Sequence, residues 1–302
     1  MRRTKRVPTR LRSSNALASV ALAACGLLVT LAACGGARQA ATHEGAAPIR
    51  AVTPDARASE AAVEPYAGKM VYVIVALCDN VNQGIVPVAP ALGNGDDPAR
   101  NLYWGARFGV KTFFTASRDW QLVADLENPA PKILERLVFK HRKEDAYLVA
   151  DAYRGSEIRQ ATADFLNAVS GNTNPTVELG GKTYGLSRGA SSHLVAYVGH
   201  DGLMDFRLSY VPKRRDEVRR DAVILACASK NFFADALKQA GANPLLWTTN
   251  LMAPEAYVLK AAVDGWLAGA EGEEVRERAA KAYDSYQSCG LNSARTLFAS
   301  GW

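Results

Sequence analysis

Short apolar runs separated by amphipathic segments are the feature that most constrains the fold of this chain. The runs are rich in β-branched residues and lie at 70–77, 145–151, 193–198, 222–226 and 244–248. Uninterrupted apolar runs of this length are typical of strands that are covered on both faces. Apolar residues recur at helical spacing over 158–169, and helices are also expected at 254–267 and 273–288. This alternation predicts a single three-layer α/β domain with a mainly parallel sheet flanked by helices.

The segments between these elements give weaker signals. We expect a helix to begin within 101–108, a short strand at 110–114, and a helix at 131–139 with proline at its start. Proline, glycine and aspartate predict a loop at 85–97, and 172–189 is also expected to be a loop. The mixed charges of 213–220 predict an exposed helix between two strands.

Two neighbouring apolar runs are followed by residues whose side chains can take part in catalysis. The run at 193–198 is followed by Gly199 and His200, and the run at 222–226 is followed by Cys227. The carboxyl ends of parallel strands meet at one edge of a sheet, where ligands bind. A thiol with its own base is the arrangement that cysteine nucleophiles require. The sequence therefore predicts a dyad of Cys227 as nucleophile and His200 as base.

The start of the chain has the order of a secretory signal. Basic residues are followed by an apolar stretch from about Ala16 to Thr30, which is short and alanine-rich for a membrane span. Leu31-Ala32-Ala33-Cys34 resembles the lipobox of bacterial lipoproteins, in which the cysteine becomes the lipid-bearing first residue. This resemblance implies a signal peptide at 1–33 and a lipid anchor at Cys34 that holds the protein in the cell envelope. An ordinary secreted protein cleaved near Ala33 is the alternative.

The signal also accounts for the basic balance of the chain. Six of the 36 Lys and Arg residues, and none of the 30 Asp and Glu residues, lie within 1–33. The remaining chain therefore carries equal numbers of basic and acidic side chains. Nucleic acid is not an expected partner, since a basic surface would be needed for it. Residues 34–66 have the composition of a flexible tether, and 67–302 that of one domain.

The cysteines that remain after Cys34 number three, namely Cys78, Cys227 and Cys289. Because three is odd, at least one thiol has no partner within the chain. An oxidising compartment allows Cys78 to pair with Cys289 and leaves Cys227 free. Burial of all three as small apolar residues is the alternative.

The chain resembles the caspase-like cysteine peptidases, which include metacaspases, gingipains and clostripain. The resemblance rests on Val198-Gly199-His200-Asp201-Gly202 and Leu225-Ala226-Cys227, an apolar strand ending in His and Gly and another ending in Ala-Cys. His200 and Cys227 are 27 positions apart, which is enough for a crossover between parallel strands. The resemblance implies a caspase-like fold and a hydrolase that acts on a peptide or protein substrate.

The residues around the dyad have expected roles. Backbone N–H groups near Gly199 or Gly202 are candidates to stabilise an oxyanion. Asp201 and Asp205 are candidates to orient His200 or to line a pocket for a basic side chain, and a solvated position in the loop is the alternative for Asp201. We expect no cofactor and no metal ion. The oligomeric state is left open.

Several features have simpler interpretations. His193 is expected to pack at the start of its strand, His141 to lie among solvated charges, and His43 to lie in the tether. The loop at 93–97 is interpreted as a polar turn, with calcium as the alternative. The Gly-Lys-Thr sequence at 181–183 lacks the rest of a phosphate loop. A second function stays open for the whole chain: a non-catalytic lipoprotein that binds an envelope partner, with Cys227 buried or in a disulfide.

Overall fold

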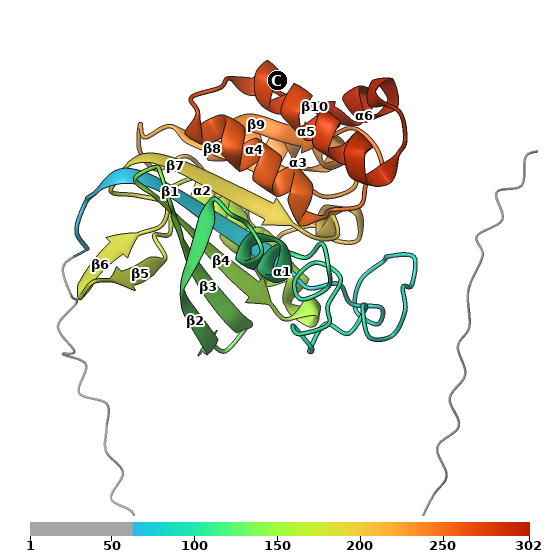
Figure 1. Cartoon of the computed structure of the whole chain (residues 1–302), viewed down its shortest axis with the longest axis horizontal. Coiled ribbons are helices and arrows are strands. Elements are labelled where there is room, and N and C mark those ends of the chain that lie inside the picture. Colours follow the sequence, from blue (N-terminus) through green and yellow to red (C-terminus); the bar gives the residue numbers. More distant parts are fainter. Residues whose placement is uncertain (1–62) are drawn as a thin grey trace, which may run out of the picture. The chain divides into compact units, whose positions relative to one another are not determined.

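The protein was analysed as a computed structural model, which describes residues 63–302. An eight-stranded sheet runs through this part of the chain in the order β10-β9-β8-β7-β1-β4-β3-β2. Its strands are β1 (Tyr66–Ala76), β2 (Trp120–Ala130), β3 (Ile133–His141), β4 (Ala146–Tyr153), β7 (Ala190–Val198), β8 (Arg220–Leu225), β9 (Asn243–Thr248) and β10 (Phe298–Ala299). The five strands β4, β1, β7, β8 and β9 are parallel to their neighbours among these five, and the other pairings are antiparallel (Figure 1).

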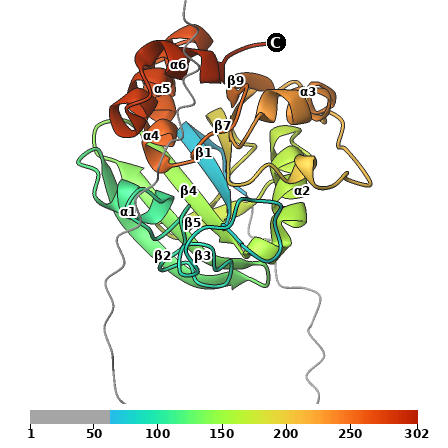
Figure 2. The same cartoon turned by 90° about the vertical axis from the view of Figure 1, so that its right-hand side faces the viewer.

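Helices cover both faces of the sheet. One face carries α1 (Val110–Thr115), α4 (Ala256–Leu267), α5 (Gly272–Gln287) and α6 (Leu291–Leu297), and the other carries α2 (Ile158–Val169) and α3 (Ser229–Ala240). Figures 1 and 2 show this arrangement from two sides. The prediction of an α/β domain with a mainly parallel sheet is confirmed. No helix within residues 63–302 combines the length and the apolar character needed to cross a bilayer.

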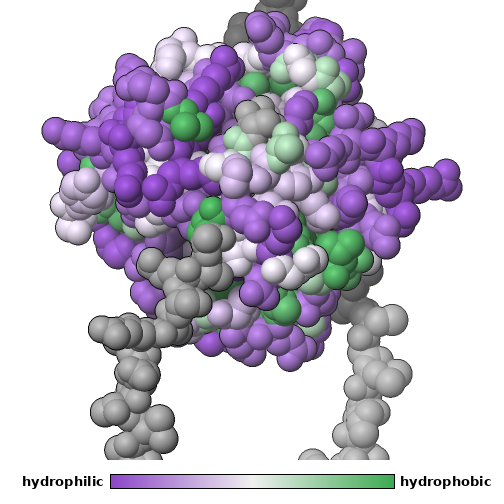
Figure 3. Space-filling model, turned by 90° about the vertical axis from the view of Figure 1, so that its left-hand side faces the viewer, coloured by the Kyte–Doolittle hydropathy of each residue, from purple (hydrophilic) through white to green (hydrophobic). Residues whose placement is uncertain are grey.

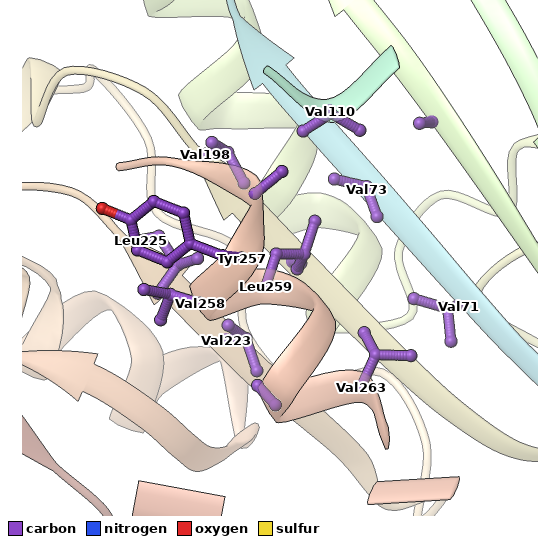
Figure 4. Close-up of a cluster of buried hydrophobic side chains, with 14 of the residues drawn as sticks. Val71, Val73, Val110, Val198, Val223, Leu225, Tyr257, Val258, Leu259 and Val263 are labelled. Carbon is purple, nitrogen blue, oxygen red and sulfur yellow. The ribbon is translucent and has the colours of Figure 1, made fainter. Parts of the chain in front are cut away.

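The surroundings of the central strand β1 explain why most of its sequence is apolar without alternation. Val71, Val73 and Val75 point to the face covered by α4, whereas Tyr72 and Ile74 belong to the core on the α2 and α3 side. Successive side chains of a strand point to opposite faces, so a strand covered on both faces must be apolar throughout. Figure 4 shows the first of these cores, in which valines of the sheet meet Val258, Leu259 and Val263 of α4 and Val110 of α1.

One edge of the sheet differs from the prediction. The segment 131–139 is not a helix but belongs to β3, which forms an antiparallel hairpin with β2. Apolar residues four positions apart, such as Ile133 and Leu137, fit a helix as well as a strand, and the sheet decides in favour of the strand. The proline at 131 lies in the turn, and Asn128, three residues earlier, has a left-handed conformation with φ +47° where the register of β2 shifts. The expected strand at 110–114 is the helix α1, and 101–108 forms turns.

The expectation of a loop at 172–189 is also wrong. The segment 172–189 holds a hairpin of β5 (Thr176–Leu179) and β6 (Lys182–Gly185), which turns at Gly180 and Gly181 with φ of +59° and +77°. Two successive positive φ values are the signature of a tight hairpin turn, and glycine adopts them without strain.

The charged segment 213–220 is not an exposed helix. Its last residue, Arg220, begins β8 with 1% of its surface exposed and forms an ion pair with Asp216, at 2.8 Å. The guanidinium also donates to the carbonyl oxygen of Ser187 at 2.6 Å. Hydrogen bonds from Arg220 lower the pKa of Asp216. The run is therefore exposed as expected, except for Asp216 and Arg220, but it is an irregular segment and not a helix, and its last residue anchors the start of a strand.

Candidate active site

The sheet brings His200 and Cys227 to the same level of neighbouring strands. Val198 of β7 pairs with Leu225 of β8, and each is followed two residues later by one member of the predicted dyad. The N–H of Gly199 continues the ladder by donating to the carbonyl oxygen of Leu225 at 3.2 Å. Figure 2 shows the edge of the sheet at which β1 and β7 end. Within residues 63–302 no hydrogen bond joins the Cys227 sulfur to the His200 ring.

The His200 ring is held by a carboxylate. Its Nε2 lies 2.7 Å from Oδ2 of Asp205, and only 7% of the side chain is exposed. Tyr197 donates to the His200 carbonyl oxygen at 2.9 Å. A carboxylate at Nε2 favours the tautomer that carries its proton there, which leaves the lone pair on Nδ1. The Nδ1 atom has no hydrogen-bond partner in the described part of the chain, and it is not among the unpartnered atoms that are buried. It is therefore available as a base.

Asp205 is positioned from a distant loop. The Gly84 N–H donates to the same Oδ2 atom at 2.9 Å. A Cβ atom at Gly84 would collide with the Asp205 carboxylate, so the contact requires glycine there. The loop after β1 and the loop after β7 are thereby joined at the carboxylate that holds His200.

Cys227 is a half-buried, unpaired thiol. Its sulfur accepts a hydrogen bond from the Met252 N–H at 3.4 Å and lies 3.6 Å from the Met252 carbonyl oxygen. Burial raises the pKa of Cys227, the Met252 N–H lowers it, and the charge of Asp201 raises it. The net shift is upward, so the resting group at neutral pH is a thiol and not a thiolate.

The turn after Cys227 is strained and locked. Ala228 adopts a left-handed conformation with φ +49°, which costs a residue other than glycine about 1–2 kcal/mol. Thr248 of β9 compensates, since its Oγ1 donates to the Ala226 carbonyl oxygen and lies 3.0 Å from the Ser229 N–H. The Ser229 hydroxyl donates to Ile224 at 3.0 Å. These buried bonds fix the turn between β8 and α3 in which Cys227 lies.

The glycines of the predicted site have structural constraints. The Gly199 N–H is occupied by Leu225, and the residue has φ +151° with no room for a Cβ atom against Ala76. Gly202 is buried, and a Cβ atom there would meet the Phe206 ring at 2.6 Å. The N–H of Cys227 itself donates no hydrogen bond within residues 63–302. Unlike the Gly199 N–H, it is therefore free to donate to the oxyanion that forms on a substrate carbonyl oxygen when the sulfur attacks the carbonyl carbon.

Asp201 is not the solvated loop residue that was one alternative. Its side chain is fully buried, and its Oδ1 accepts a hydrogen bond from the Leu203 N–H at 3.0 Å at the start of a short 3-10 turn, η2 (Gly202–Met204). The other oxygen, Oδ2, is buried without a partner among the described residues. Burial is the main cause that raises the pKa of Asp201 to about 7, and the neighbouring Asp205 adds to it.

The other histidines lie away from Cys227. His193 is 1% exposed and accepts the Ala190 N–H at Nε2, 3.0 Å away, and burial lowers its pKa to about 4. His141 accepts the Glu144 N–H at 2.9 Å and packs edge-on against Trp120. His43 and Cys34 lie outside the described residues.

The remaining cysteines do not form the disulfide that was considered. Cys78 is buried and Cys289 is exposed, and both are unpaired. Burial raises the pKa of Cys78 to about 11. In the loop at 93–97, Asp97 binds Arg100 and Asp96 binds Arg154. No three His, Cys, Asp or Glu side chains between 63 and 302 gather as metal ligands would.

Comparison of the chain with known protein families, with curated proteins and with solved structures finds no match. The functional argument therefore rests on the geometry of the site. Met252, Thr248 and Ser229 support Cys227, and no sequence signal marks them, because they come from other elements.

Proposed function

We propose that this protein is a lipid-anchored cysteine endopeptidase of the cell envelope with Cys227 as nucleophile and His200 as general base. The observation that carries the proposal is the Asp205–His200 pair, placed at the register of Cys227 on the neighbouring strand. A nucleophile, a base and a group that orients the base form the arrangement that activates a thiol. Asp205 supplies the third role, with His200 Nδ1 left to accept the proton.

The raised pKa of Cys227 selects the form of the mechanism. A neutral thiol must lose its proton as it attacks, so His200 acts as a general base rather than as the partner of a preformed thiolate. The Cys227 sulfur bonds to the carbonyl carbon of the peptide, the carbonyl electrons move to oxygen, and the proton passes to Nδ1. Catalytic hydrogen bonds often form only with substrate present, which accounts for the absence of one between the two residues here.

The intermediate then collapses in the usual order. The C–N bond breaks, and His200 gives its proton to the leaving amine. A water molecule attacks the thioester, loses a proton to His200, and releases the carboxylic acid and the Cys227 thiol. The N–H of Cys227 and the positive end of α3 face the oxyanion of each intermediate.

The strand order supports a caspase-like assignment. The parallel strands follow the order β4-β1-β7-β8-β9, so that the chain begins near the middle of the sheet and moves outward in both directions. The base follows β7 and the nucleophile follows β8, in the order of the sequence resemblance. The lipid anchor and the location in the cell envelope are supported only by the resemblance of the sequence at Cys34 to a lipobox.

Alkylation of Cys227 by iodoacetamide, followed by peptide mass spectrometry, tests the dyad. In a Cys289→Ser background, we expect labelling of Cys227 to slow about a hundredfold in His200→Ala, since general bases contribute at least that factor. Asp205→Asn should slow it as well, and His141→Ala is the matched control. Equal rates in the parent and in His200→Ala would contradict the proposal.

A non-catalytic protein that binds an envelope partner is the second candidate. It is favoured by the partial burial of Cys227 and by the upward shift of its pKa that this burial causes. This candidate predicts that Cys227 stays unlabelled under conditions in which the exposed Cys289 reacts. Rapid, His200-dependent labelling would exclude it.

A further inference from the structure

A groove of about 630 Å³ lies beside the candidate active site. One wall is the loop that follows β7, and the other is the first half of α3. The residues that the argument uses are Met204, Asp205, Arg207, Asn231, Phe232 and Asp235. The volume is within the range of sites that hold small molecules or peptide side chains.

The groove shares one residue with the candidate site. Asp205 belongs to its wall and also holds the His200 ring at 2.7 Å. The opposite wall, α3, begins two residues after Cys227. The groove therefore borders both the carboxylate that holds the base and the helix that follows the nucleophile.

Both walls expose large apolar side chains. Met204 is 43% exposed on the loop, and Phe232 is 41% exposed on α3. Leu251, 68% exposed, lies next to Met252, the residue that contacts the Cys227 sulfur. The opposite end of the domain, where the parallel strands begin, shows a mostly hydrophilic surface with small separate apolar patches (Figure 3). Exposed apolar side chains at the rim of a site are typical of a binding surface.

The charges of the groove favour an uncharged occupant. The lining holds three charged side chains, and Asp205 on the loop wall is already bound to the His200 ring and to the Gly84 N–H. The other two are Arg207 on the loop wall and Asp235 on the α3 wall, and no ion pair within residues 63–302 uses either side chain. Because these charges have opposite signs, neither a cationic nor an anionic side chain gains from the pair as a whole. The exposed amide of Asn231 is able to bond a peptide backbone, which a hydrocarbon ligand would leave unused.

We propose that this groove is the specificity site of the peptidase and that it takes a large uncharged apolar side chain of an extended polypeptide between Met204 and Phe232. The proposal rests on the proposed function, since it assigns the substrate class of the same site. It predicts that substrates are segments rich in leucine or phenylalanine, such as those exposed by unfolded proteins.

Binding to the inactive Cys227→Ala protein tests the groove without catalysis. The probes are dye-labelled heptapeptides of alanine and serine whose central residue is leucine, phenylalanine, glycine or aspartate, followed by fluorescence anisotropy. We expect the apolar peptides to bind about tenfold more tightly than the glycine peptide, as one side chain in an apolar pocket allows. Phe232→Asp and Met204→Ser should each remove that preference.

The control is Leu126→Ser on β2, a substitution of an equally exposed apolar residue far from α3 in the sheet order. It should leave the preference unchanged. Equal binding of all four peptides, unchanged binding in both groove variants, or no measurable binding at all would overturn the proposal. Circular dichroism of each variant separates loss of the groove from loss of the fold.

Reaction of the active protein separates this proposal from the proposed function. If iodoacetamide labels Cys227 in a His200-dependent way but peptidyl chloromethyl ketones with phenylalanine and glycine react at equal rates, the dyad stands and the groove assignment is wrong. If apolar peptides bind the groove and labelling of Cys227 does not depend on His200, the peptidase is wrong and the groove remains a peptide site.

Discussion

Replacing Asp201 by asparagine is expected to stabilise the protein at neutral pH and to change its stability little near pH 4. The wild-type carboxyl is fully buried, and its pKa rises from the ordinary value of 3.8 to about 7. Between these values the folded protein keeps a proton on Asp201 that the unfolded chain has released. The free energy of unfolding contributed by this group therefore falls as the pH rises from about 4 to about 7.

The magnitude follows from the width of that window. A difference of about three pH units at about 1.4 kcal/mol each gives up to about 4 kcal/mol. Asparagine keeps an oxygen to accept the Leu203 N–H and carries no charge, so it avoids the cost of ionising a buried group. The stability of Asp201→Asn relative to wild type should thus grow with pH and level off above about pH 7.

Guanidinium chloride unfolding, followed by tryptophan fluorescence at one-unit steps from pH 4 to pH 8, measures the difference. Groups that titrate equally in both proteins, such as His193, cancel in the comparison. Asp235→Asn is the matched control, because Asp235 is exposed, and it should show no such trend. A difference between Asp201→Asn and wild type that stays flat over this range would refute the reasoning.

Three further outcomes are expected. His193→Gln should flatten the loss of stability between about pH 6.5 and pH 4, seen by the same unfolding assay, because the folded protein holds this imidazole neutral with a pKa of about 4 and the unfolded chain protonates it first. Thr248→Val should cost about 1–3 kcal/mol in urea unfolding, since it leaves buried polar groups unpaired, and it should slow alkylation of Cys227 as the turn shifts. Asp151→Asn should cost about 3–5 kcal/mol, because it leaves the Arg136 guanidinium without its buried carboxylate; equal unfolding midpoints for this variant and wild type would contradict the role of the pair.

The parallel strands could be predicted because their environment is simple. The segments 70–76 of β1 and 194–198 of β7 are covered on both faces, so their residues are all apolar and the runs stand out without reference to the rest of the chain. The helix α2 was predicted at 158–169, the bounds that the structure shows, since its apolar residues recur on one face only.

The antiparallel edge could not be predicted in the same way. β3 carries Glu135 and Arg136 between apolar residues, a pattern that fits a helix equally well. Its strand form depends on partners elsewhere: Arg136 bonds to Asp151 of β4 at 2.6 Å, and Glu135 accepts from the Trp104 indole. Such long-range pairs are absent from any local window of sequence.

The candidate site also has residues that the sequence indicated and features that only the folded chain shows. His200 and Cys227 were found because each follows an apolar run. The burial of Asp201 had no local signal, since a position between histidine and glycine is typical of an exposed turn. The sequence had offered Asp205 and Asp201 equally as the residue that orients His200, and only the folded loop places Asp205 at the ring.

The sequence by itself therefore determined the class of the fold, the positions of its buried strands along the chain and the candidate residues that follow two of them, because these depend on solvent exclusion along short segments. The tertiary structure decided the register that sets His200 level with Cys227, the carboxylate that holds the imidazole and the groove beside it. Those features depend on contacts between segments far apart in the chain, and only the packed sheet brings such segments together.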